Sequence, residues 1–176
     1  MAGARNLADG KTKYTVLTTR PADPKSPTVA ELNDGIDLSC DILTSDFTWS
    51  AADSEKVSEK ALCDKNNSNA LGAGNFSAGI TLWRKFDPAT GSATPADEPG
   101  WVALNTKGTE VWAYARETGK DSTEPWAAGD EIYLGGSVLV DSPQRTDGSG
   151  FIKRRIPMEP QSMYENITVA SSGSGD

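Results

Sequence analysis

The chain has 176 residues, of which 36% are hydrophobic and 24% charged, a composition that predicts one folded domain. Its net charge of −8, from 17 Lys and Arg against 25 Asp and Glu, argues against a protein that binds nucleic-acid phosphates. The sequence contains no histidine, which excludes Ser-His-Asp and Cys-His catalytic groups and HExxH zinc sites. It has no apolar run of 18 residues and a polar N-terminus, so we expect synthesis and folding in the cytoplasm.

The first predicted elements are a strand and a short helix. β-Branched and aromatic residues from Gly10 to Thr19 predict the strand, and three prolines follow it. Thr28, with Glu31 three residues later, forms a capping-box pattern, and Gly35 is a typical helix end. These signals predict a helix of about two turns over Val29–Asp34.

A long hairpin is predicted from Ile36 to Cys63, with its polar turn at Ser50–Ser54. Antiparallel pairing across this turn places Cys40 opposite Cys63, and in a reducing cytoplasm we expect both as free thiols. We expect these thiols to be buried, because a free cysteine packs as a small apolar side chain. The returning strand carries both charge signs and little apolar content. A hairpin this polar needs a partner or projects into solvent.

The second half of the chain predicts further strands. Gly135 and Gly136, within one of them, indicate a β-bulge or a close approach of two backbones. The predicted elements are a loop (64–75), a strand (76–86), a loop (87–100), a short helix (101–105), strands at 109–116 and 130–141, a turn (147–150), and strands at 151–158 and 163–169. The Ser/Gly-rich residues 171–176 are expected to be disordered.

No residues are singled out for catalysis, for a cofactor or for a metal. Two isolated cysteines cannot hold zinc alone, and we interpret the many carboxylates as solvated surface charges. A glycosidase would need two carboxylates in one cleft, about 5 to 10 Å apart, and nothing in the sequence indicates such a pair.

Lys153, Arg154 and Arg155 form the only dense basic cluster, and on a strand their side chains alternate between faces. The cluster is interpreted either as an ordinary solvated strand or as a salt-bridging contact to an acidic neighbouring subunit. Trp49 and Trp126 stand beside polar turn sequence, which makes them candidates for sugar stacking or subunit contacts. The other three tryptophans, Trp83, Trp101 and Trp112, are expected in the core.

Four segments carry a family resemblance: LTSDFTW (43–49), VSEKALC (57–63), NALGAGNF (69–76) and FIKRRIP (151–157). They resemble the major tail (tail tube) proteins of long-tailed bacteriophages of actinobacteria, and the likeness covers most of residues 11–160. The resemblance implies a mainly β fold, a β-sandwich or barrel with a flanking short helix. It also implies a single domain over 1–170 with an N-terminal arm (1–10).

The resemblance further implies a structural virion protein, not an enzyme. Six copies would close into a ring through an inner β-barrel, and stacked rings would form the tube through which the genome leaves. The predicted hairpin (36–63) and the strand at 76–86 would contribute the barrel. The N-terminal arm and the loop around Glu55 would contact the next ring. Implied partners are further copies of the chain and the tail terminator, tail-tip or baseplate, and tape-measure proteins.

A ring of six copies, each with a charge of −8, carries −48. Duplex DNA has about one negative charge per 1.7 Å, so an acidic lumen would repel it and let it slide without specific binding. Asp41, Asp46 and Glu59 are the candidate lumen residues. Candidate subunit contacts are Trp49, Glu55, Lys153, Arg154 and Arg155. The alternative is a monomeric β-sandwich binding module, for capsid decoration or carbohydrate, that uses exposed tryptophans.

Overall fold

The computed structural model describes residue 3 and residues 5–171. Its main feature is one antiparallel sheet of eight strands, which confirms the mainly β prediction. The strand order is β2 (Ile36–Asp37), β1 (Thr12–Leu17), β7 (Glu110–Glu117), β8 (Glu131–Val140), β10 (Lys153–Thr168), β6 (Asn75–Trp83) and β3 (Thr48–Ala52), with β9 (Gln144–Arg145) paired to β10.

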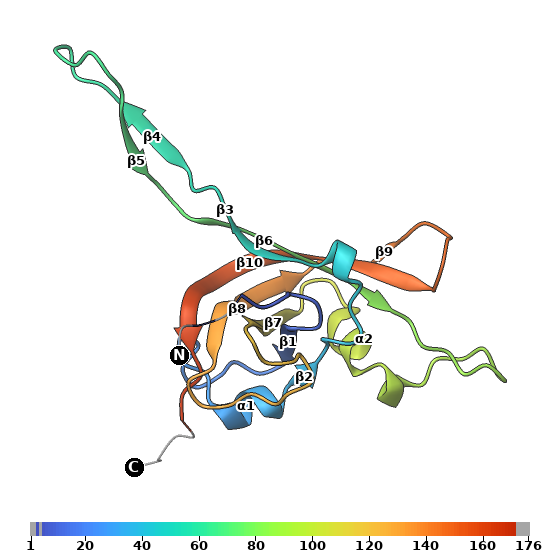
Figure 1. Cartoon of the computed structure of the whole chain (residues 1–176). Coiled ribbons are helices and arrows are strands. Elements are labelled where there is room, and N and C mark those ends of the chain that lie inside the picture. The colour runs from blue at the N-terminus through green and yellow to red at the C-terminus, as the bar shows by residue number, and fades with distance from the viewer. Residues whose placement is uncertain (1–2, 4, 172–176) are drawn as a thin grey trace.

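Strand β10 folds this sheet into two layers (Figure 1). Its first part, Lys153 to Met158, pairs with β6, and its second part, Met158 to Thr168, pairs with β8. A bulge between Pro160 and Ser162 lies where the strand passes from one layer to the other. The layers face each other, because the Trp49 indole of β3 donates a hydrogen bond from Nε1 to the Leu134 carbonyl of β8 at 3.0 Å.

The predicted glycine pair lies at this bend. Gly136 has φ +155°, and a Cβ there would lie 1.9 Å from the Ser162 carbonyl oxygen of β10. A Cβ on Gly135 would lie 2.2 Å from the ring of Tyr114. The expectation of a close backbone approach is therefore confirmed.

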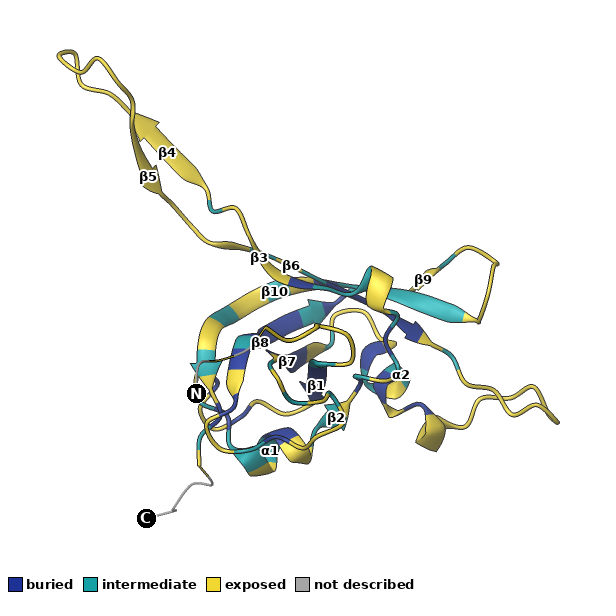
Figure 2. Ribbon diagram, viewed as in Figure 1, coloured by how far each residue is buried: buried dark blue, intermediate teal, exposed yellow. Residues whose placement is uncertain are grey.

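The core has two parts, separated by the layer β1-β7-β8 (Figure 2). The larger part fills the space between the layers, with Tyr14 in edge-to-face contact with Phe47 and Trp49. The smaller part lies under α1 (Val29–Asn33) and comprises Leu17, Leu32, Trp112, Tyr114, Trp126, Ile132 and Val169.

The local helix signals are confirmed. The Thr28 hydroxyl accepts from the Glu31 amide at 3.3 Å, and the Glu31 carboxylate accepts from the Thr28 amide at 2.8 Å. The helix predicted at 101–105 is α2 (Pro99–Leu104), which follows a 3-10 turn at Pro95–Asp97. Glu98 precedes α2 and accepts two hydrogen bonds from Arg84, at 2.8 and 3.0 Å, which lower its pKa below the ordinary value.

The predicted hairpin at 36–63 is wrong in its boundaries. Ile36–Asp37 pairs with β1, a 3-10 turn follows at Thr44–Asp46, and β3 pairs with β6. Beyond β3 the chain continues into β4 (Lys56–Glu59), which pairs with β5 (Ser68–Leu71) inside the predicted loop at 64–75. In both ladders the residue numbers of paired residues add to 127, as for Thr48 with Gly79 and Glu59 with Ser68, so the two ladders share one register. The two ladders thus belong to one long hairpin, centred between Cys63 and Asp64.

Two further expectations change with this register. Cys40 follows β2 in the body while Cys63 lies at the hairpin tip, so the two are not opposite each other. Both are free but exposed, so the expectation of buried thiols is wrong. The strands predicted at 151–158 and 163–169 are one strand, β10, because the bulge after Pro160 accommodates a residue that was expected to end it. In the segment expected to be disordered, residues 172–176 lie outside the described residues.

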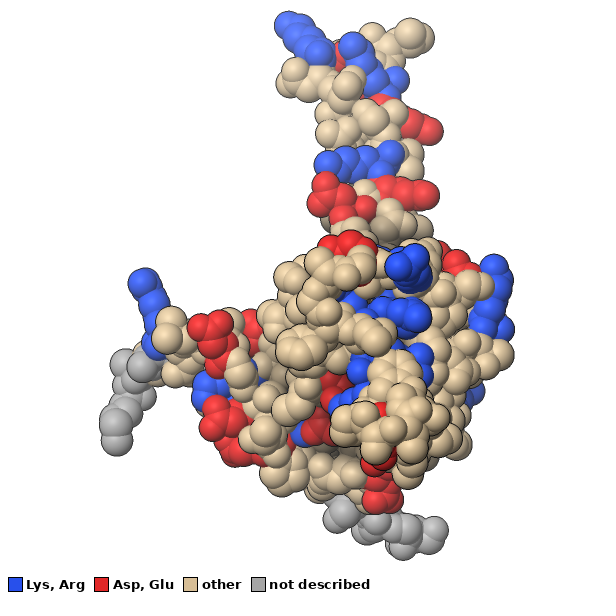
Figure 3. Space-filling view, turned by 90° about the vertical axis from the view of Figure 1, so that its right-hand side faces the viewer, with Lys and Arg blue, Asp and Glu red and all other residues tan. Residues whose placement is uncertain are grey.

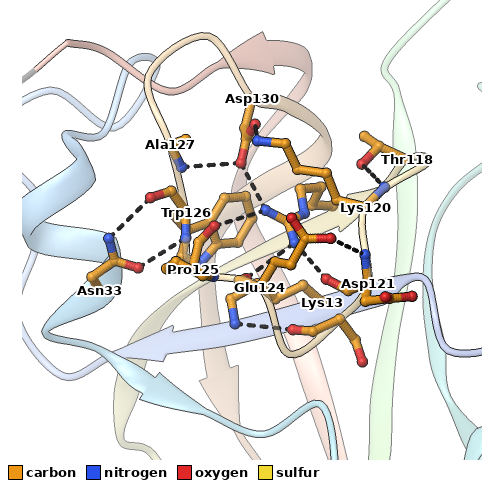
Figure 4. A network of polar contacts seen from close by, with 12 residues as sticks. Lys13, Asn33, Thr118, Lys120, Asp121, Glu124, Pro125, Trp126, Ala127 and Asp130 are labelled. Carbon is orange, nitrogen blue, oxygen red and sulfur yellow. Dashed lines mark hydrogen bonds and ion pairs between the residues drawn. The ribbon is translucent and has the colours of Figure 1, made fainter.

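A buried arginine organises the loop between β7 and β8 (Figure 4). Arg116 is 0% exposed, and its guanidinium donates to Asp130 at 2.7 Å and to the carbonyls of Asp121, Glu124 and Pro125 at 2.9 to 3.2 Å. Lys120 also contacts the Asp130 carboxylate. The loop is thereby held against the layer that carries Lys13, whose ammonium donates to the Ser122 carbonyl at 3.1 Å.

Candidate assembly surfaces

The part of the hairpin beyond the sheet, residues 53–74, leads away from the body and is called the arm below (Figure 1). Two backbone hydrogen bonds join the β4–β5 ladder of the arm to the β3–β6 ladder of the sheet. The Gly72 amide donates to the Glu55 carbonyl at 2.7 Å, and the Glu55 amide donates to the Ala73 carbonyl at 3.0 Å. Every arm residue except Ser54 is exposed, and Leu62, Leu71 and Val57 are 109%, 77% and 51% exposed. Because a two-stranded hairpin alone is marginally stable in water, the arm is a surface that another molecule can stabilise.

The outermost strands β2 and β3 leave the sheet with two open edges. Beside β3, the segment at 41–43 continues the edge: Leu43 donates to the Thr81 carbonyl at 2.9 Å, and Trp83 donates to the Asp41 carbonyl at 3.1 Å. The edge of β3 itself carries small residues, of which Ser50, Ala51 and Ala52 are exposed. Unpaired edges of this kind are templates for pairing with another strand.

The outer face of β3, β6 and the first part of β10 carries mainly small and polar residues, with Trp83 and Lys153 at one end. Trp49, Ile80 and Ile156 point into the core, so their neighbours along each strand point outward. The outward residues include Thr48, Ser50, Ser77, Gly79, Thr81 and Arg155. Arg155 covers Gly79, where a Cβ would lie 3.2 Å from its guanidinium.

The candidate lumen residues fall in two places. Asp46 lies at this outer face, where it accepts a hydrogen bond from the Thr81 hydroxyl at 3.1 Å. Asp41 lies beside the same edge of β6 as β3 does, and its carboxylate forms an ion pair with Lys85 at 2.7 Å. Glu59 is on β4 of the arm, so the structure does not place it with the other two.

The basic cluster does alternate between faces. Arg154 lies opposite the core residue Leu82 of β6 and opposite Arg145 of β9, whereas Arg155 lies opposite Thr81 on the outer face. Lys153 pairs with Asp147 at 3.4 Å, but none of these three arginines forms an ion pair with a described residue. Figure 3 looks onto the side where β9 lies in Figure 1 and shows Lys and Arg gathered below the arm.

The tryptophans predicted at the surface are buried. Trp49 is 3% exposed in the main core, and Trp126 is 2% exposed, with its indole donating to the Thr15 hydroxyl at 2.9 Å. Neither ring offers surface for a sugar or for another subunit, so the expectation of exposure is wrong. Of the three expected in the core, Trp112 is buried, Trp101 is half-buried and Trp83 is 37% exposed.

Sequence reasoning missed exposed apolar residues as possible contacts. Leu62 and Leu71 of the arm lie in short polar stretches with no periodic pattern, whereas Phe151 and Ile152 were expected inside the strand at 151–158 and instead precede β10 as exposed residues. The only available signal for the two leucines was their position in segments too polar to form a core of their own.

Within the described residues, no three His, Cys, Asp or Glu side chains are arranged to hold a metal ion. No described helix is long and apolar enough to span a membrane.

One comparison with known proteins identifies a family. The family model described as "Phage tail tube protein" matches residues 1–173. A search of curated proteins finds no match to the chain.

Proposed function

The chain belongs to the phage tail tube protein family, and we propose that six copies form each ring of a stacked tail tube through which the genome is ejected. The family gives the chain a structural role in the virion tail, and we infer that this role involves no catalysis. Residues 1–170 would act as a single domain. The observation that carries the proposal is the family match over nearly the whole chain.

The open sheet edges support assembly through a shared barrel. Pairing β3 or β2 with a strand of a neighbouring copy would satisfy backbone groups that the isolated chain leaves to water. Closing such a sheet into a barrel removes its edges. We propose that β3, β6 and the first part of β10 supply the inner barrel, in place of the hairpin at 36–63 expected from the sequence.

The outer face of these strands, which carries small residues such as Ser50 and Gly79 beside the cation Arg155, is proposed as the lumen wall. Asp46 lies on it, and Asp41 and Glu59 remain further lumen candidates. A ring charge of −48, from six copies of −8, would repel DNA phosphates and prevent them from binding the wall.

Contacts between rings would come from the arm, including Glu55 at its base, and from the N-terminal residues 1–10. Of the latter, residues 5–10 are exposed. Arg154 and Arg155, which lack an ion-pair partner among the described residues, and Lys153 are proposed contacts to carboxylates of an adjacent copy. The tail terminator, tail-tip or baseplate, and tape-measure proteins are proposed as further partners.

The assembly is tested by negative-stain electron microscopy of the concentrated, untagged protein, with size-exclusion chromatography of the same sample. We expect rings or hollow tubes, formed alone or after addition of tail-tip components. A protein that stays monomeric with those components present would contradict the proposal and favour the binding module. That alternative now lacks its two exposed tryptophans, since Trp49 and Trp126 are buried.

The lumen is tested with Asp46→Lys and Glu59→Lys in a phage, with Asp34→Lys as the control. Asp34 is an exposed C-cap residue of α1, away from the proposed barrel. We expect intact tubes from all three variants but impaired DNA delivery only for the first two, because added cations bind phosphate. Normal delivery by intact Asp46→Lys and Glu59→Lys tails would remove both residues from the lumen.

A further inference from the structure

A groove opens between the two layers near the start of β1, with a volume of about 360 Å³. Tyr14, Ile42 and Phe47 give it an apolar floor. Asp9 and Glu117 also line it, and both are exposed. Neither carboxylate forms an ion pair with a described residue; Glu117 accepts only a hydrogen bond from the Thr12 hydroxyl, at 3.2 Å.

The tip of the arm has the complementary pattern. Leu62 is fully exposed, with nothing apolar packed over it. Lys60 and Lys65 flank it on the two sides of the hairpin centre, and neither forms an ion pair within the described part of the chain. Asp64 also lies at the tip, where its carboxylate accepts from the Ala61 amide at 3.0 Å, so Lys60, Asp64 and Lys65 together carry a charge of +1. The tip thus presents an exposed leucine with a net positive charge around it, and the groove presents an apolar floor with two anions.

The arm of the same chain does not reach this groove, because it leads away from the body (Figure 1). Cys63 lies eleven positions beyond Ala52, and at about 3.3 Å per position the arm extends about 36 Å beyond the sheet. A folded domain of this length has a radius of gyration of about 16 Å, so the arm is long enough to lie along a neighbouring copy.

We propose that the arm tip of one copy docks in this groove of a second copy, with Leu62 on the apolar floor and Lys60 and Lys65 near Asp9 and Glu117. The inference rests on the proposed function, since it requires that copies assemble. Each copy supplies one tip and one groove. The contact is therefore head-to-tail and repeats from copy to copy along the tube.

The two cysteines report on this contact directly. Cys63 is next to Leu62 at the tip, and Cys40 follows Ser39, which lines the groove. Both thiols are exposed, and in one chain they belong to the arm and the body. Docking brings Cys63 of one copy near Cys40 of the next.

The first experiment treats assembled tubes with a short bismaleimide and separates the products on a denaturing gel. We expect a ladder of dimers, trimers and larger species, because every copy has one thiol of each kind. Cys40→Ser and Cys63→Ser should each abolish the ladder while tubes still form. Tubes that give no ladder overturn the docking. Dimers that persist in Cys40→Ser also overturn it, because they show that arm tips meet each other.

The second experiment reverses the charges, with circular dichroism as the check that each variant folds. Lys60→Glu with Lys65→Glu should lose tube assembly, and so should Asp9→Lys with Glu117→Lys. In a mixture of the two double variants, the acidic tip of the first can dock in the basic groove of the second. The mixture should therefore recover assembly in part. Lys25→Glu, at an exposed lysine of the body before α1 that no proposed contact uses, is the control and should assemble normally.

Wild-type levels of tubes from the Lys60→Glu/Lys65→Glu variant would overturn the docking while leaving the proposed function intact. A wild-type protein that forms no tubes, even with tail-tip components, would overturn the proposed function itself. The two failures are thus distinguishable.

Discussion

At the scale of single residues, the bend in β10 depends on a position that only glycine fits. Gly136 combines φ +155° with a Cβ position 1.9 Å from a backbone oxygen of β10. Neither strand can shift easily, because β8 is paired on both sides, with β7 and β10. Any side chain at this position would push apart the two strands that join the layers.

We therefore expect Gly136→Ala to lower the free energy of unfolding of the monomer by more than about 3 kcal/mol, or to prevent folding. Gly148→Ala is the matched control, since a Cβ there comes no closer than 3.9 Å to its nearest neighbour, the flexible Arg145 side chain. Urea denaturation followed by tryptophan fluorescence measures both. Equal stability of the two variants would show that the bend does not depend on Gly136.

The buried pair of Arg116 and Asp130 is a second position where one side chain decides stability. Asp130→Asn leaves the guanidinium of a residue that is 0% exposed without its only carboxylate partner among the described residues. Breaking such a buried pair costs about 3 to 5 kcal/mol, so we expect a loss of stability of that order in urea denaturation at neutral pH. A loss below about 1 kcal/mol would mean that the loop carbonyls suffice to hold Arg116.

The same pair predicts how stability depends on pH. Burial alone would raise the pKa of Asp130, but hydrogen bonds from Lys120, the Ala127 amide and Arg116 outweigh it and leave the pKa below the ordinary value. A carboxyl with a lowered folded-state pKa contributes stability above its unfolded pKa, about 3.9, and loses it as the pH falls further. We expect the wild-type unfolding free energy to fall below pH 4, with a shallower fall in Asp130→Asn. Parallel curves would contradict the assignment.

At the scale of elements, sequence patterns predicted those strands and helices whose signals are local. The strands β1, β7 and β8 have one or both faces in the core and show β-branched and apolar runs, and the capping box fixes α1. Trp49 and Trp126 were misjudged because burial depends on distant residues: the first packs beside Tyr14 and the second donates to Thr15.

The hairpin was misplaced for a physical reason. The arm is exposed on both faces, so it has no alternation of apolar and polar residues to indicate strands. The polar stretch at 50–54 has the composition of a turn, yet residues 50–52 are paired strand residues of β3 and the chain continues from them into a second ladder of the same register. The candidate lumen and contact residues could be chosen by charge from the sequence, but the surfaces that group them depend on a register that the sequence does not encode locally.

The register also shows how to remove the arm cleanly. Ala52 and Asn75 are directly paired, so residues 53–74 can be replaced by Asn-Gly, a two-residue turn that suits an antiparallel hairpin. We expect this variant to fold with a thermal midpoint within a few degrees of the wild type, since the arm lies outside both core clusters. It should form no tubes in electron microscopy. Normal tubes would contradict a role for the arm in assembly.

At the scale of the whole molecule, a charge of −8 makes copies of the chain repel each other, so assembly needs short-range contacts that outweigh this repulsion. Exposed apolar residues on the arm and unpaired sheet edges are contacts of this kind. The two kinds of contact can be distinguished by measurement. Strand pairing between copies protects backbone amides along a sheet edge from exchange, whereas docking of side chains does not require such protection.

Hydrogen–deuterium exchange of monomer and tubes therefore tests whether the barrel closes through β3. We expect peptides covering 48–52 to exchange at least tenfold more slowly in tubes, because a neighbouring strand would pair with amides that face water in the monomer. Peptides covering α1, which packs against its own chain, should exchange equally in both states and serve as the internal control. Unchanged exchange at 48–52 in intact tubes would show that rings close without pairing at β3, and the other open edge, β2, would then be the strand to examine.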